Sequence, residues 1–273
     1  MALLTAMGNR REEAGNLPVR RGSRYPDVHG LGSGGAEPVR MRVELHFHLL
    51  PGVDDGPRDE AEALALARAA VADGIRTVVA TPHAGFVDPA TLRERVAALH
   101  VPLDVLPGAE LLAADVMRLT AAELDLVAQG PPGRRWVLFE APLDGGLSGV
   151  AEALARLSSL GLGVLIAHPE RCPGWWTGGA LDDARAAGAR LQVNASSLLG
   201  DHGPEPARRG LALVRDGRAT VLASDAHGVH RPPCLGAAID LLGSAAEPLV
   251  RDRPAVLLRR GLPGLRGSAI AAA

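Results

Sequence analysis

Residues 43–48 read VELHFH, and residues 223–227, far along the chain, read ASDAH. Each stretch is a short apolar run that ends in two potential metal ligands one residue apart: His46 with His48, and Asp225 with His227. Side chains at positions i and i+2 of a β-strand point to the same face of the sheet. Each pair therefore offers two ligands on one side of a sheet, and the two pairs can meet if the fold is closed. Together they predict a metalloenzyme.

The composition predicts one globular domain. The chain has 273 residues, of which 47% are hydrophobic and only 3% aromatic, so the core must consist mainly of Ala, Leu and Val. A formal charge of −2 gives no reason to expect nucleic acid or an anionic membrane as a partner. No apolar run approaches the ~20 residues that cross a bilayer. Two cysteines do not make a disulfide framework, so we expect a cytoplasmic protein.

Both ends of the chain differ from its middle. Residues 1–40 combine scattered arginines with a glycine-rich run and lack apolar periodicity, so we expect a disordered N-terminal extension. An alternative is that Met41 is the natural start. The domain is expected over residues 41–261, followed by a flexible C-terminal tail over residues 262–273.

Strand-like and helix-like segments alternate from Met41 onward. Repeated βα units predict an α/β fold with a parallel sheet that is buried on both faces. About seven strands in one domain favour a distorted parallel βα barrel. A dinucleotide-binding fold would need a glycine fingerprint after the first strand, where this chain has HFH. The expected strands are residues 42–48, 75–80, 103–106, 135–140, 162–167, 190–193 and 219–224.

Polar residues follow these strands at the ends where the active sites of parallel α/β folds lie. The side chains are imidazoles and carboxylates without thiolates, a donor set that suits manganese, iron or zinc in a hydrolytic site. The strand-end motifs are HxH (46–48), TPH (81–83), GAE (108–110), FE (139–140), AHPER (167–171) and SDAH (224–227).

This ordered set of motifs resembles the polymerase and histidinol phosphatase (PHP) superfamily. Residues 48–57, 80–83, 167–171 and 194–200, and SDAH with Arg231 after it, are similar to the bacterial PHP-type protein-tyrosine phosphatases of capsule and exopolysaccharide synthesis. The resemblance implies a distorted βα barrel that holds three divalent metals, with manganese expected before iron or zinc. The residues that match the family's metal ligands are His46, His48, His83, Glu110, Glu140, His168, Asp225 and His227.

The resemblance also implies catalytic positions. Asp55, Arg171 and Arg231 match positions that support the metals and bind phosphate, and His227 is expected to act in catalysis as well. The expected reaction is attack of a metal-bridged hydroxide on a phosphomonoester, without a phosphoenzyme. Asp55 or His227 is expected to protonate the leaving oxygen.

The expected substrate is the phosphotyrosine of a bacterial tyrosine kinase that serves exopolysaccharide or capsule export. The first alternative is a small-molecule phosphatase such as histidinol phosphatase. A PHP nuclease is less well supported because the domain carries no basic patch, and a non-enzymatic metal-binding module would leave both arginines without a role. The oligomeric state stays open.

A cysteine nucleophile is not expected. Neither Cys172 nor Cys234 is followed by the arginine-closed loop of a cysteine phosphatase. Cys172 stands where relatives have an aromatic residue, and Trp175 is expected to pack over the barrel mouth. Glu44 replaces a more usual Asp before HxH, and its longer side chain could alter how the ligands are oriented. His202 is expected at the surface.

Overall fold

The computed structural model describes residues 41–140 and 142–266. The predicted extension, residues 1–40, and the last part of the predicted tail, residues 267–273, lie outside the described residues. The first part of that tail packs on the domain: Leu262 and Leu265 are buried, and the Leu262 amide donates to the carbonyl oxygen of Arg134 at 3.0 Å. The folded part of the chain therefore continues to Arg266.

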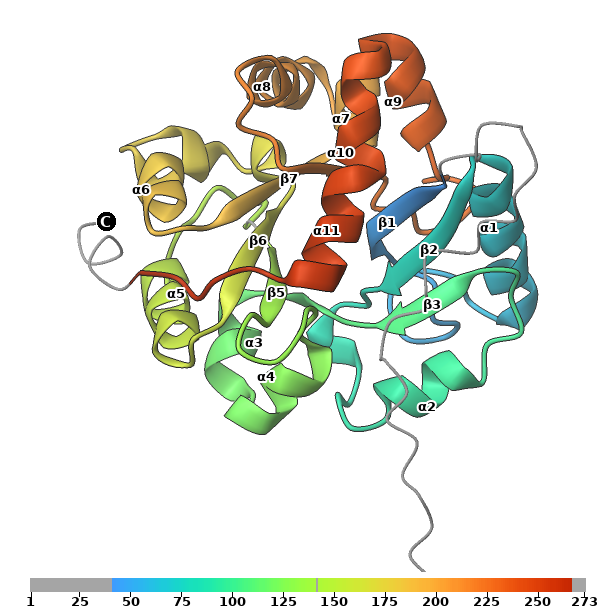
Figure 1. Ribbon diagram of the computed structural model, residues 1–273, viewed down its shortest axis with the longest axis horizontal. Helices are drawn as coiled ribbons and strands as arrows, with labels where there is room; N and C mark the ends of the chain where they lie inside the picture. The colour runs from blue at the N-terminus through green and yellow to red at the C-terminus, as the bar shows by residue number, and fades with distance from the viewer. Residues whose placement is uncertain (1–40, 141, 267–273) are drawn as a thin grey trace, which may run out of the picture. The chain divides into compact units, whose positions relative to one another are not determined.

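Eight strands form two parallel sheets, one of three strands and one of five (Figure 1). The first sheet has the order β1-β2-β3 and the second the order β4-β5-β6-β7-β8. The strands are β1 (Arg42–Phe47), β2 (Ile75–Ala80), β3 (Asp104–Pro107), β4 (Glu110–Leu111), β5 (Trp136–Glu140), β6 (Gly163–Ala167), β7 (Arg190–Asn194) and β8 (Val221–Ala223).

The α/β class with parallel pairing agrees with the sequence analysis, but the expected number of about seven strands is wrong. The additional strand is β4, which has two residues. An alternating pattern cannot be recognised over so short a segment, and β4 follows β3 with only Gly108 and Ala109 between them.

Isolated parallel bridges connect the two sheets. Phe47 at the end of β1 pairs with Ala226 beyond β8, and His83 beyond β2 pairs with Glu110 of β4. The amide of His48 donates to the carbonyl oxygen of Ala226 at 3.0 Å. These bridges bring the carboxyl end of the first strand beside that of the last, as a closed arrangement of the site requires.

Helices follow most strands, and Figure 1 shows α1, α5, α6 and α8 on the outside of the strands. The α-helices are α1 (Glu60–Ala72), α2 (Leu92–Ala97), α3 (Ala113–Arg118), α4 (Ala121–Val127), α5 (Val150–Ser159), α6 (Ala180–Ala186), α7 (Ala195–Leu199), α8 (Pro204–Arg215), α9 (Leu235–Leu242), α10 (Glu247–Val250) and α11 (Asp252–Arg260). Short 3₁₀ helices are η1 (Ala84–Phe86), η2 (Pro169–Arg171), η3 (Pro173–Trp176) and η4 (Ser244–Ala246).

Local sequence signals set the limits of α1. The carboxylate of Asp59 accepts a hydrogen bond from the amide of Glu62 and caps the first turn. The helix ends before Gly74, whose φ of +80° lies in the left-handed region that glycine adopts at low cost. The chain then enters β2 directly, so the glycine fixes where the strand begins.

Alanine, leucine and valine make up most of the buried apolar side chains, as the composition predicts. The larger buried side chains include Phe47, Trp136 and Phe139. In such a core, truncation of one buried leucine to alanine costs about 2–5 kcal/mol. None of the helices in the described part of the chain has the length and apolar character that a membrane crossing requires.

Candidate metal and phosphate site

The two ligand pairs that frame the sequence lie side by side in the structure. The amide of Asp225 donates to the carbonyl oxygen of His46 at 3.2 Å, and the adjacent bond from His48 to Ala226 continues this contact. The register of β1 on β2 shifts between Glu44 and Phe47, a stretch that includes His46. Irregular pairing of this kind can re-aim a side chain next to a functional site.

Glu110 lies at the centre of the cluster. Its Oε1 lies 3.0 Å from Nε2 of His168, and its Oε2 lies 3.1 Å from Nε2 of His46 and 3.3 Å from Nε2 of His48. His83 contributes Nδ1, also 3.3 Å from Oε2. Four imidazoles from the ends of three strands, β1, β2 and β6, thus surround one buried carboxylate.

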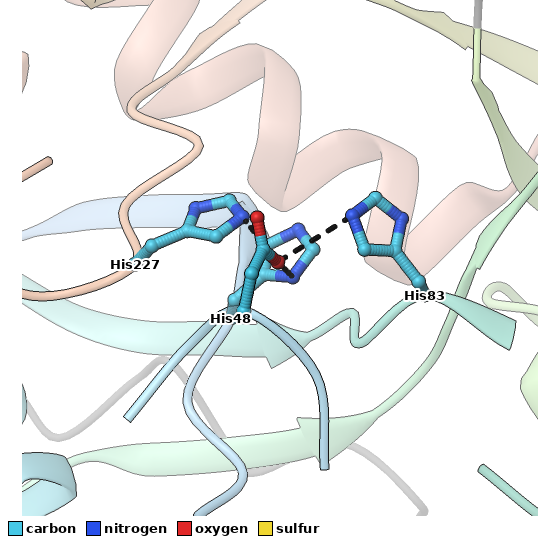
Figure 2. A group of neighbouring side chains, drawn as sticks. His48, His83 and His227 are labelled. Carbon is cyan, nitrogen blue, oxygen red and sulfur yellow. Dashed lines mark ion pairs between the residues drawn. The ribbon is translucent and has the colours of Figure 1, made fainter. Parts of the chain in front are cut away.

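A second group lies toward the solvent, around Asp55. Its Oδ1 is 3.2 Å from Nε2 of His227, 3.6 Å from Nε2 of His83 and 3.9 Å from Nδ1 of His48. Figure 2 shows these three histidine rings converging on a carboxylate from different segments of the chain. The Asp55 side chain is 59% exposed, so this group opens to the outside while Glu110 is buried.

Four overlapping groups have ligand atoms within 4.8 Å of one another, the spacing at which one ion can be shared. Each of the eight residues predicted as ligands falls in at least one group, and Asp55 joins them. The groups are His48, Asp55, His83 and His227; His46, His48 and Glu110; His46, His168 and Asp225; and His83, Glu110 and Glu140.

Two of these residues have strained backbones. His168 has φ of +30° and Asp225 has φ of +53°, in the left-handed region that residues other than glycine seldom occupy. Such conformations cost about 1–3 kcal/mol each and persist where surrounding contacts enforce them, often at functional sites. His168 immediately follows β6, and Asp225 is the second residue after β8.

Charge is concentrated in this buried cluster. Burial and the neighbouring charge of Glu110 raise the pKa of Glu140 to about 8. Burial alone would lower the pKa of His46, but the charges of Glu110 and Asp225 outweigh it and raise that pKa to about 9. The carboxylates thus favour positive charge on His46, and a divalent cation could supply that charge in place of a proton.

The outer nitrogens of the His46 and His48 rings make hydrogen bonds that suit metal ligands. Oε1 of Gln192 accepts from Nδ1 of His46 at 3.0 Å, and Oδ2 of Asp54 accepts from Nδ1 of His48 at 2.7 Å. A proton held on Nδ1 leaves the Nε2 lone pair of each ring directed into the cluster, as in metal-binding histidines. The donor set and its outer hydrogen bonds therefore fit divalent metal ions.

Neither of these two acceptors was among the site residues predicted from the sequence. Asp54 adjoins the expected Asp55, and the adjacent acidic residues were the available signal. Gln192 lies at position i−2 from Asn194, so both side chains leave the same face of β7. Nδ2 of Asn194 donates to Oδ2 of Asp225 at 2.8 Å, which places this alternating pair behind the ligands.

Glu44 links the first strand to the last. Its Oε2 accepts from the amide of Ser224 at 2.8 Å, and its Oε1 accepts from the amide of His46 at 3.3 Å. Burial raises the pKa of this carboxyl to about 7. The longer side chain thus spans from β1 to the segment that carries Asp225.

The two arginines meet at one carboxylate oxygen. Nη1 of Arg171 lies 3.0 Å and Nη2 of Arg231 2.6 Å from Oδ2 of Asp225. Nη1 of Arg231 also approaches Oδ2 of Asp55 at 3.7 Å. Both side chains keep part of their surface exposed at the edge of the cluster, so their remaining donors can reach a bound anion.

The cysteines lie in poor surroundings for a nucleophile. Cys172 is buried, and burial raises the pKa of its thiol. Burial, with nearby acidic residues, raises the pKa of Cys234 to about 12.

Trp175 is 3% exposed and belongs to the core, so it does not offer its ring to a ligand. His202, expected at the surface, is half-buried with Nε2 3.1 Å from Oγ of Ser196.

One protein family and its named members match most of this chain. The model of a family described as capsular polysaccharide synthesis, CpsB/CapC, matches residues 42–247. The tyrosine-protein phosphatase YwqE of Bacillus subtilis (strain 168) is 31% identical over 234 residues, which cover 80% of this chain and 91% of that protein. The putative tyrosine-protein phosphatase CapC of Staphylococcus aureus is 28% identical over 208 residues, 70% of this chain and 79% of the relative.

A solved structure has the same fold. It comes from work on YwqE from Bacillus subtilis and CpsB from Streptococcus pneumoniae, described as unique metal-dependent tyrosine phosphatases. The match has a TM-score of 0.66 and 29% identity, and it covers 81% of this chain and 96% of that one.

Proposed function

Because the chain belongs to the CpsB/CapC family of capsular polysaccharide synthesis, we propose that it is a metal-dependent protein-tyrosine phosphatase. The observation that carries this proposal is the cluster of imidazoles and carboxylates around Glu110, with Arg171 and Arg231 at its edge. Ligands for cations and donors for a phosphate dianion are adjacent there, as hydrolysis of a phosphomonoester requires.

The eight predicted ligands would hold divalent ions. When bound, such ions act as Lewis acids on phosphoryl oxygens and lower the pKa of water. The four overlapping ligand groups support more than one ion, and we propose three. Nitrogen and oxygen donors without thiolates suit manganese, which the resemblance to PHP-type phosphatases favours over iron and zinc.

Arg171 and Arg231 would bind the non-bridging oxygens of the phosphate. A guanidinium presents several N–H donors in one plane, so each arginine can keep its bond to Asp225 and still donate to the substrate. Asp225 would then position both arginines while its Oδ1, 3.2 Å from Nε2 of His46, faces the imidazoles. Substrate and cations would thereby share one carboxylate that fixes their relative position.

Asp55 is assigned a positioning role. Its hydrogen bond with His227, which outweighs the effect of burial, holds the pKa of Asp55 well below the usual range. The carboxylate is then ionised at neutral pH and orients His227 in place of donating a proton. A tyrosyl leaving group has a pKa near ~10 and needs less protonation than an alkoxide.

We assign the two sheets to one distorted βα barrel. The parallel bridges between Phe47 and Ala226 and between His83 and Glu110 support this arrangement. The proposed substrate is a phosphotyrosine protein, specifically a tyrosine kinase of polysaccharide export. This part of the proposal rests on the family's description and on relatives named tyrosine-protein phosphatases.

Parallel kinetics on two substrates test the function. Purified protein supplied with Mn²⁺ is assayed on a phosphotyrosine peptide and on histidinol phosphate. We expect the larger kcat/KM for the peptide. A larger kcat/KM for histidinol phosphate would replace the proposal with a small-molecule phosphatase, and no turnover of either would indicate a non-enzymatic module.

A further inference from the structure

A cavity of about 710 Å³ extends from the candidate site along helix α1. Asp55, His227 and Arg231 line one end of it. The rest lies between α1 and the turn at residues 228–232, away from the buried ligands. Its size falls within the range of about 300–1,000 Å³ that is typical of ligand pockets. A phosphate bound at the arginines would therefore adjoin a space that the phosphate itself does not fill.

The walls of this cavity are largely apolar. Ala65 and Ala69, four residues apart, form an exposed alanine strip on one face of α1, with buried Leu66 beside them. Opposite, Gly228 and Arg231 close a turn through a hydrogen bond from the Arg231 amide to the Gly228 carbonyl oxygen at 3.2 Å. This turn presents Val229, which is 83% exposed.

The acidic side chains that line the cavity, Asp55 and Glu62, are paired with basic ones. Nε of Arg58 donates to Oε1 of Glu62 at 2.8 Å, and Asp55 contacts both His227 and Arg231. The two acidic side chains are thus matched by basic ones. Neither a strongly acidic nor a strongly basic segment gains much by entering, whereas an apolar side chain would bury the surfaces of Val229 and the alanine strip.

We propose that this cavity, the α1 groove, binds the residues next to the phosphotyrosine of a protein substrate and selects apolar side chains there. The inference rests on the proposed phosphatase function and adds a specificity-determining surface to it. The phosphate binds at the arginines, and the tyrosyl ring extends from there into the end of the groove lined by Asp55, His227 and Arg231. A neighbouring apolar side chain then packs between the alanine strip of α1 and Val229.

Substitutions in the groove should raise KM for peptides with apolar neighbours of the phosphotyrosine and leave kcat/KM for small substrates nearly unchanged. Ala65→Trp fills the groove, and Val229→Ala removes one wall. Because Val229 is exposed, its truncation has little effect on stability. Ala97→Trp is the matched control, since Ala97 is also an exposed helical alanine, in α2, but does not line the groove.

The substrates are p-nitrophenyl phosphate and two phosphotyrosine peptides, with valine or with glycine on both sides of the phosphotyrosine. Ala65→Trp is expected to raise KM for the valine peptide about tenfold or more. Val229→Ala should raise it about three- to tenfold and leave the glycine peptide unchanged. All three variants should retain kcat/KM on p-nitrophenyl phosphate within about twofold, which also reports correct folding.

Equal KM values for the valine peptide in the wild type and both groove variants would overturn the groove, with the phosphatase function intact. An equal effect of Val229→Ala on both peptides would overturn the apolar selection. Wild-type protein that turns over neither peptide would overturn the proposed function, and the groove with it.

Discussion

Nδ1 of His46 lies 3.0 Å from Oε1 of Gln192, a residue 146 positions further along the chain. Because an amide oxygen only accepts hydrogen bonds, His46 must carry its proton on Nδ1, and Nε2 faces Glu110 and Asp225. The interaction joins β1 to β7 and sets the tautomer of a candidate ligand.

Gln192→Leu should therefore weaken metal binding. Loss of an outer hydrogen bond to a ligand typically lowers metal affinity by about 10–100-fold. Titration of the metal-free protein with Mn²⁺ measures this change. Gln129→Leu is the control, because Gln129 is also buried but its side-chain amide donates to the carbonyl oxygens of Pro107 and Val127 and not to a predicted ligand. Equal Mn²⁺ affinity in Gln192→Leu and wild type would show that Gln192 does not support a ligand.

Removal of metal should abolish activity and lower stability. Ligand present at about 100 times its Kd stabilises a folded protein by roughly 2.7 kcal/mol. Dialysis against a chelator should therefore remove turnover of the phosphotyrosine peptide and lower the thermal midpoint, and Mn²⁺ should restore both. Full activity after the metal content has been shown to be negligible would contradict the proposed metal site.

Arg171→Lys and Arg231→Lys should each lower kcat/KM on the phosphotyrosine peptide by about 10–100-fold, because lysine lacks the planar set of donors that grips phosphate. The inhibition constant of inorganic phosphate should rise in parallel. Arg208→Lys on exposed α8 is the control and should match the wild type. If phosphate inhibits all three variants alike, the arginines do not bind the anion.

Glu44→Ala should lower the free energy of unfolding by about 1–3 kcal/mol, since it leaves the buried amide of Ser224 without an acceptor. Urea unfolding measures the change. Glu94→Ala, on the exposed side of α2, should stay within about 0.5 kcal/mol of the wild type. Comparable decreases in the free energy of unfolding in the two variants would show that Glu44 has no special role in linking β1 to β8.

His202 should contribute to acid sensitivity. Burial, followed by the charges of Arg171 and Arg231, lowers the pKa of His202 from 6.5 to about 4. A lowered folded-state pKa means that stability is complete above the unfolded value and is lost as pH falls from about 6.5 to about 4. His202→Asn should therefore flatten the decline of stability over this range, measured by urea unfolding of the metal-free protein. An unchanged slope would contradict the prediction.

The ligands at the strand ends were predictable from the sequence, whereas the shortest strand was not. The pairs His46/His48 and Asp225/His227 were recognisable because two ligands at i and i+2 after an apolar run have few other uses. The family match confirms the resemblance drawn from the ordered motifs. Short elements escaped detection, because β4 has two residues and produces no periodicity.

Long-range contacts were also beyond the sequence. The amide of Leu265 donates to the carbonyl oxygen of Leu162, and nothing in residues 262–266 themselves indicates this bond. Leucines among glycines and a proline are instead typical of a flexible tail. Likewise, the acceptor of Nδ1 in His46 depends on which residue of β7 lies opposite, which only the folded register decides. Hydrogen bonds between distant segments follow from the fold and not from the composition of either segment.

Arg171, Arg231 and Asn194 all donate to the same oxygen, Oδ2 of Asp225. The oxygen has limited acceptor capacity, so loss of one donor strengthens or re-aims the others. The two arginines are thus thermodynamically coupled, and the combined effect of both substitutions should depart from the sum of the single effects. Evolutionary change at either position would then depend on the residue present at the other.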